Sequence, residues 1–127
     1  MFKGLLLVGA GGFLGSSLRY AAAVLCARLY PTLTFPLTTL LVNILGCFII
    51  GFLGGLAAFK QVFTENGRLF VFTGILGGFT TFSAFGLETF HLIRNDQWPL
   101  AFLNIFLQVA VGLAAVAVGH SLATRIF

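Results

Sequence analysis

Charge is scarce in this sequence. Asp, Glu, Lys and Arg together make up 8% of its 127 residues, whereas soluble domains carry about 25%. Hydrophobic residues make up 59%, and the mean hydropathy is +1.08. Because so few charges cannot cover a water-facing surface, the composition excludes a soluble domain and indicates that the bilayer is the solvent.

Groups that carry enzyme chemistry are also few and far apart. The sequence holds three acidic residues and two histidines: Glu65, Glu88, Asp96, His91 and His120. The histidines fall on different apolar segments, and two of the acids are expected in loops. No nucleophile with a base, acid pair or side-chain metal cluster can be assembled from them, so we do not expect an enzyme. Cys26 and Cys47 lie inside apolar segments and are expected to pack as small hydrophobic residues.

The basic residues form no patch. They stand singly, which argues against nucleic-acid binding despite a pI of about 9.7. Four are expected on the membrane face that holds both termini, and three on or towards the opposite face: Lys3, Lys60, Arg68 and Arg125 against Arg19, Arg28 and Arg94. A difference of four against three is too small for the positive-inside rule to favour one orientation strongly. A chain without a clear preference could insert in both orientations, and the two forms could pair antiparallel.

Four apolar segments dominate the chain, over residues 4–29, 35–59, 69–93 and 98–124. Each exceeds the ~20 residues that cross a ~30 Å hydrocarbon core, and short loops make neighbouring segments antiparallel. Glycines four residues apart, such as Gly11 and Gly15 or Gly51 and Gly55, favour close helix packing in lipid. We therefore predict an all-α membrane protein in which residues 1–127 form a single domain of four transmembrane helices.

The third segment carries poor helix formers at its centre. Gly77, Gly78, Thr80 and Thr81 lie near the expected bilayer midplane. Either the helix is broken there, which is tolerated where backbone lines a cavity, or the glycines form a packing face on an unbroken helix. A break would expose carbonyl groups suited to a cation and N–H groups suited to an anion.

Several polar and aromatic residues near this depth have two interpretations each. Phe82 and Phe85 share a helix face, where their rings either pack against apolar neighbours or turn electropositive edges to a small anion. Asn43, with Thr39 one turn earlier, either bonds another helix or donates N–H to a dehydrated ion. Asn104 and Gln108 form a similar pair on the last segment, with the same ambiguity.

Two charges inside the apolar segments are costly enough to need a role. Arg19 lies in the latter half of the first segment, and Glu88 lies well off the centre of the third. Both belong to the same half of the membrane, so they could form an ion pair or line a vestibule. Alternatively, Glu88 extends to the membrane surface.

Three motifs together resemble the Fluc (CrcB) family of fluoride channels. They are Gly-Gly-Phe-Leu-Gly-Ser-Ser-Leu-Arg-Tyr at residues 11–20, Thr-Leu-Leu-Val-Asn-Ile-Leu-Gly at 39–46 and Gly-Gly-Phe-Thr-Thr-Phe-Ser-Ala-Phe at 77–85. The third is highly specific, and the resemblance covers the whole chain in length and number of spans.

The resemblance implies a multi-pass protein of the bacterial inner membrane that passes fluoride down its gradient and so lowers cytoplasmic fluoride. It implies an antiparallel, dual-topology homodimer with two pores, surrounded by lipid, in which the third helix is broken near the midplane. The pore residues implied by the match are Phe82, Phe85, Asn43, Thr39, Thr81 and Ser83. The backbone carbonyls of Gly77 and Thr80 would hold one structural sodium ion, and Arg19 and Glu88 would be vestibule or structural charges.

Two other functions compete with a channel. A small proton-coupled multidrug exporter also has four spans, but it needs a carboxylate near the midplane, and the only intramembrane acid is the off-centre Glu88. A scaffold subunit would explain the glycine spacing but not the polar groups gathered at one depth. The channel is therefore the predicted function, with the exporter as the alternative.

Overall fold

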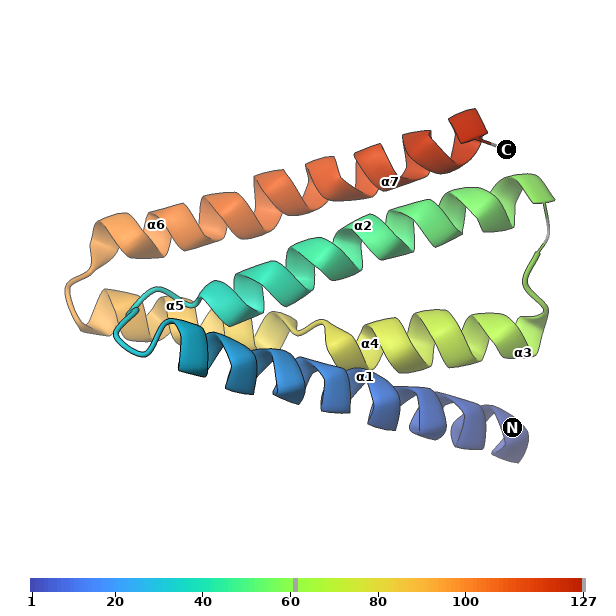
Figure 1. Ribbon diagram of the computed structural model, residues 1–127, viewed down its shortest axis with the longest axis horizontal. Coiled ribbons are helices and arrows are strands. Elements are labelled where there is room, and N and C mark those ends of the chain that lie inside the picture. Colours follow the sequence, from blue (N-terminus) through green and yellow to red (C-terminus); the bar gives the residue numbers. More distant parts are fainter. Residues whose placement is uncertain (61, 127) are drawn as a thin grey trace.

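The computed structural model describes residues 1–60 and 62–126, and the regular structure in that part of the chain is helical (Figure 1). Four stretches are long and apolar enough to cross a membrane: Phe2–Leu29, Leu37–Lys60, Glu65–Arg94 and Trp98–Ile126. This confirms the prediction of an all-α protein with four candidate membrane spans. Successive spans run in opposite directions, so both termini lie at the same end of the molecule (Figure 1).

The first two spans are single helices separated by a proline-containing loop. Helix α1 (Phe2–Leu29) ends where the amide of Tyr30 donates to the carbonyl of Cys26 at 2.8 Å, just before Pro31. Helix α2 (Leu37–Lys60) starts directly after Pro36, whose fixed φ suits the entry to a helix. These prolines therefore set the length of the first loop.

The third span is built from four helical segments. It begins with α3 (Glu65–Arg68), capped by Thr64, and continues through the π-helical segment η1 (Leu69–Leu76) into the short helix α4 (Gly77–Phe79). The next two residues have extended backbone, with φ −85° and ψ 160° at Thr80 and φ −154° and ψ 116° at Thr81. Helix α5 (Phe82–Arg94) follows. Thr80 and Thr81 are called the extended pair below.

The fourth span contains a second π-helical segment. It starts at α6 (Trp98–Phe106), with Pro99 in the first turn, passes through η2 (Leu107–Val111) and ends with α7 (Gly112–Ile126). Such π-helical segments often occur at functional sites. Here η2 carries Gln108, one of the polar residues of the candidate site.

Glycines bring the spans together in two close pairs. Helix α2 packs along α7, and α1 packs along η1 and α4. A side chain at Gly51 or Gly119 would overlap the backbone of the facing helix in the first pair. In the second pair, a Cβ on Gly74 would lie 2.8 Å from the Cα of Gly11. Small residues thus serve as the helix-contact positions that their spacing predicted.

Candidate functional site

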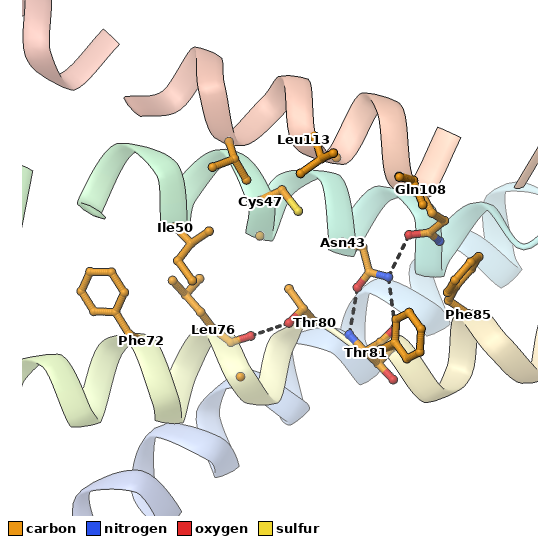
Figure 2. Close-up of a pocket in the computed structure, with 16 residues that line it drawn as sticks. Asn43, Cys47, Ile50, Phe72, Leu76, Thr80, Thr81, Phe85, Gln108 and Leu113 are labelled. Atoms are coloured by element: carbon orange, nitrogen blue, oxygen red, sulfur yellow. Dashed lines mark hydrogen bonds between the residues drawn. The ribbon is translucent and has the colours of Figure 1, made fainter. Parts of the chain in front are cut away.

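The extended pair is bonded to α2 by one side chain, that of Asn43. Its Oδ1 accepts from the amide of Thr81 at 2.8 Å, and its Nδ2 donates to the Thr81 carbonyl at 3.1 Å (Figure 2). Backbone polar groups outside a helix ladder need partners, most of all away from water. Asn43 supplies both partners to Thr81, so the extended conformation leaves neither of these groups unpaired.

The same amide reaches the fourth span. Asn43 Nδ2 also donates to Oε1 of Gln108 at 3.0 Å, which links α2, the extended pair and η2 in one cluster (Figure 2). The Nε2 atom of Gln108 is buried and has no hydrogen-bond partner within the described residues. A buried amide N–H without a partner is a candidate donor to a water or an ion.

Side-chain bonds also fix both ends of the extended pair. The hydroxyl of Thr80 donates to the carbonyl of Leu76 at 2.9 Å, and the Thr80 amide donates to the same oxygen at 3.0 Å. On the other side, Oγ1 of Thr81 accepts from the amide of Ala84 at 3.2 Å and so caps the first turn of α5. The hydroxyl oxygens of Ser83 and Thr81 are 3.4 Å apart.

Two phenylalanines stand on the first turn of α5. The ring centroids of Phe82 and Phe85 are 5.5 Å apart and the planes are inclined by 63°, an edge-to-face arrangement. Phe82 is 82% exposed, although it is a large apolar side chain. Its ring edge is therefore free to face a ligand, a lipid or another chain.

A cavity of about 500 Å³ lies between α2, the third span and the fourth span (Figure 2). Its wall is apolar over most of its length, with Ile50 and Phe72 far from the polar cluster. The polar cluster of Asn43, Thr81 and Gln108 closes one end. The cavity therefore combines an apolar wall with a few converging polar groups, as binding sites do.

A second polar contact lies farther along α5. The hydroxyl of Thr39 donates to Oε1 of Glu88 at 2.7 Å, while Oε2 of Glu88 is buried and has no hydrogen-bond partner in residues 1–60 and 62–126. Glu88 also lines two hollows beside the first loop, of about 260 and 490 Å³. The ion pair with Arg19, one of the alternatives left open for these charges, is thus not formed, since Oε1 of Glu88 is bonded to Thr39 and Oε2 has no partner among the described residues.

A third contact ties the fourth span to α5. Asn104 is 0% exposed, and its Nδ2 donates to Oγ1 of Thr89 at 2.9 Å. The Thr89 hydroxyl in turn donates to the carbonyl of Phe85 at 2.7 Å. Asn104 therefore bonds another helix, one of the two alternatives left open for it, although its Oδ1 has no partner among the described residues.

The structure brings most of the expected site residues to one cavity. The expected residues that line it are Asn43, Gly77, Thr80, Thr81, Phe82 and Phe85. Thr39 and Glu88 form their own contact, and Arg19 is on α1, outside the cavity lining.

Among the cavity residues that were not expected to have a site role, two lie beside Asn43 on α2. Cys47 was interpreted as a packing residue, yet it lines the cavity one turn after Asn43 (Figure 2). Gly46 was noted only as the end of a motif, and it too lines the cavity. Their spacing of three and four residues from Asn43 is the sequence signal that could have placed them on the same face of α2.

Comparison with known proteins gives consistent matches over almost the whole chain. The family model described as "CrcB-like protein, Camphor Resistance (CrcB)" matches residues 6–120. A protein of Elusimicrobium minutum named fluoride-specific ion channel FluC is 47% identical over 125 residues, which cover 97% of this chain and 95% of that protein. Proteins of the same name from Azobacteroides pseudotrichonymphae and Clostridium perfringens are 43% and 41% identical over 122 residues. The match covers 96% of this chain in both cases, and 97% and 94% of those proteins.

Proposed function

This chain belongs to the CrcB family, and on that premise we propose that it is a passive, fluoride-selective channel that lowers fluoride in the bacterial cytoplasm. The observation that carries the proposal is the arrangement around the extended pair. An edge-to-face phenylalanine pair and the Asn43 cluster line one cavity at residues matching the family motif. Relatives named as ion channels make the chain a transport protein rather than an enzyme.

The proposed pore runs along α5. Phe82 and Phe85 turn ring edges to the ion, and hydroxyl groups follow the same helix and its neighbours: Thr39, Thr81 and Ser83. Asn43 lines the same path, with its two N–H bonds donated to Thr81 and Gln108 in the single chain. Fluoride is small and strongly hydrated, so only closely spaced donors can replace its water. The electropositive edge of each phenylalanine ring adds a further favourable contact for the anion, and it does so without binding a water strongly.

The proposed assembly is an antiparallel, dual-topology homodimer with two pores in the bacterial inner membrane. Phe82 and many other large apolar side chains are exposed in the single chain, which suits contact with lipid and with a second copy. The ends of the spans carry a nearly balanced set of basic residues, which supports insertion in both orientations. Reporters that work only inside or only outside, fused to the C-terminus, test the orientation; signal from one side alone contradicts it.

We further propose that the extended pair is a break of the third helix near the bilayer midplane, and that it holds one structural sodium ion at the dimer centre. The donor set fits this ion. In an uninterrupted helix the Thr81 amide would bond the carbonyl of Gly77, but here it donates to Asn43. Gly77 lies in the last turn of the helical run that ends at Phe79, and Thr80 is its C-cap, so both carbonyls lie where the helix dipole favours a cation. When bound, sodium would supply a fixed positive charge close to the anion path.

Arg19 and Glu88 are proposed to be charges of the vestibule. The hollows beside Glu88 support this role for Glu88, since they place its side chain next to the first loop, while its Oε2 atom stays buried. An intramembrane charge at a water-filled entrance avoids most of the desolvation cost that it would meet in lipid.

Efflux from liposomes separates the channel from a proton-coupled exporter. Vesicles are loaded with potassium fluoride, and valinomycin is added to carry the balancing charge. A channel releases fluoride as soon as valinomycin is present and needs no pH gradient. Release that requires a pH gradient, or none at all, would contradict the proposal and favour the exporter.

A further inference from the structure

We propose that α2 acts as the template that holds the extended pair in place, and that Gly46 is a positioning residue for the pore. This inference rests on the proposed function for its flux readout. Gly46 and Asn43 lie three residues apart on one face of α2. The inference assigns to Gly46 a contact with Thr80, and to Asn43 a contact that holds Thr81.

Gly46 is buried against the methyl group of Thr80. A Cβ placed on Gly46 would overlap Cγ2 of Thr80, and it would also lie 3.8 Å from Cδ1 of Phe79. The absence of a side chain at position 46 therefore allows the extended pair to lie directly on α2. Elsewhere on the same helix a methyl group is accepted, since a Cβ on Gly54 would meet nothing within 4 Å.

Thr80 cannot turn its methyl group away without losing a bond. Its hydroxyl donates to the carbonyl of Leu76 at 2.9 Å, and this contact sets the side-chain rotamer. Threonine is branched at Cβ, so any rotation that moves the methyl also moves the hydroxyl. A side chain at position 46 must therefore displace the backbone of the extended pair or break the cap at the end of α4.

Asn43 provides the second half of the template. Its Oδ1 and Nδ2 hold the amide and carbonyl of Thr81, and its remaining N–H contact is with Gln108. A displaced Thr81 would lose both bonds and would also shift the first turn of α5, which its hydroxyl caps. Phe82 and Phe85 stand on that turn. The displacement caused by a methyl group at position 46 is therefore passed on to the proposed pore.

The test is a rescue experiment on the full chain. Gly46→Ala adds the methyl group that overlaps Thr80. Thr80→Ser removes the Cγ2 methyl group of residue 80 and keeps its hydroxyl. Fluoride efflux from liposomes is measured for Gly46→Ala, Thr80→Ser and the double variant, with Gly54→Ala as the matched control. We expect Gly46→Ala to lose about tenfold or more in flux, as overpacking of a fixed contact implies. The double variant should return to the level of Thr80→Ser alone, and Gly54→Ala should match the unmodified protein.

A second readout does not depend on fluoride. The 13Cα and 13Cβ chemical shifts of Thr80 and Thr81, measured on threonine-labelled protein in lipid nanodiscs, report extended or helical backbone. Gly46→Ala should move these shifts or broaden the signals, and the double variant should restore them. If the unmodified protein passes no fluoride, the proposed function is contradicted. These chemical shifts still test whether α2 holds the extended pair in place.

Three results would overturn the template. The first is a Gly46→Ala protein with unchanged flux and unchanged threonine shifts. The second is a Gly54→Ala protein that is damaged as much as Gly46→Ala. The third is a Gly46→Ala protein that does not fold and is not recovered by Thr80→Ser, because the clash would then lie elsewhere.

Discussion

The side-chain amide of Asn43 and the backbone of Thr81 exchange two hydrogen bonds, of 2.8 and 3.1 Å, between residues 38 positions apart in the sequence. This reciprocal contact satisfies the backbone at the point where Thr81 leaves the helix ladder. A side chain on one span thereby stabilises an extended segment inside another. The same amide lies at the polar end of the cavity that Phe82 and Phe85 line.

Asn43→Ala should damage both the fold and the flux. The substitution removes the partners of the amide and carbonyl of Thr81, and each unsatisfied buried group costs about 1–3 kcal/mol. We expect a lower unfolding temperature in detergent and severely reduced fluoride efflux from liposomes. Asn43→Ala protein with normal flux would refute the assignment of Asn43 to the pore.

Phe82→Ile should reduce flux severely without lowering stability. Phe82 is 82% exposed in the single chain, so shortening it removes little internal packing, whereas the ring edge proposed to face the ion is lost. Fluoride efflux and the unfolding temperature are measured on the same preparation. Phe13→Ile is the matched control, because Phe13 is also well exposed, at 70%, but lies on α1, away from the cavity. Equal flux in the two variants would contradict the role of Phe82.

Thr39→Val should destabilise the protein through Glu88. The hydroxyl of Thr39 donates to Oε1 at 2.7 Å, and the second carboxylate oxygen already lacks a partner among the described residues. A lost hydrogen bond to a charged group costs about 1.5–3 kcal/mol. Chemical unfolding of Thr39→Val and of Thr38→Val, the neighbouring control, measures the difference. A combined Thr39→Val/Glu88→Gln protein should recover part of the loss, since the uncompensated charge is gone.

Sodium should stabilise the assembled protein by mass action. An ion that binds the folded state but not the unfolded state raises the unfolding temperature in proportion to the logarithm of its concentration. Unfolding is followed in sodium chloride and in N-methyl-D-glucamine chloride at equal ionic strength. Identical curves at all concentrations would argue against a sodium ion on the carbonyls of Gly77 and Thr80.

The sequence predicted the helices better than it predicted their partners. Hydropathy alone located four membrane-length helices, because a bilayer requires long apolar runs. Glycine spacing identified contact positions such as Gly51, but not that α2 faces α7, because spacing says nothing about which helix lies opposite. The two π-helical segments were not expected, since they depend on tertiary packing rather than on local propensity.

The site was predicted as a set of residues rather than as a network. The glycine–threonine run drew attention to positions 77–81, and the family motif singled out Asn43 and the phenylalanines. Composition left open whether the run was helical. Helix propensity is a local property and does not include Asn43, a side chain 38 residues away that bonds Thr81. The contact of Gly46 with Thr80 was missed for the same reason, because it joins two helices that are far apart in the sequence.

The central claim is that this chain passes fluoride passively and selectively. The most direct test is efflux from liposomes reconstituted with pure protein, half of them loaded with potassium fluoride and half with potassium chloride, followed with ion-selective electrodes after valinomycin. The account predicts rapid release of fluoride and retention of chloride, with no requirement for a pH gradient. Retention of fluoride, or equal release of both anions, would contradict it.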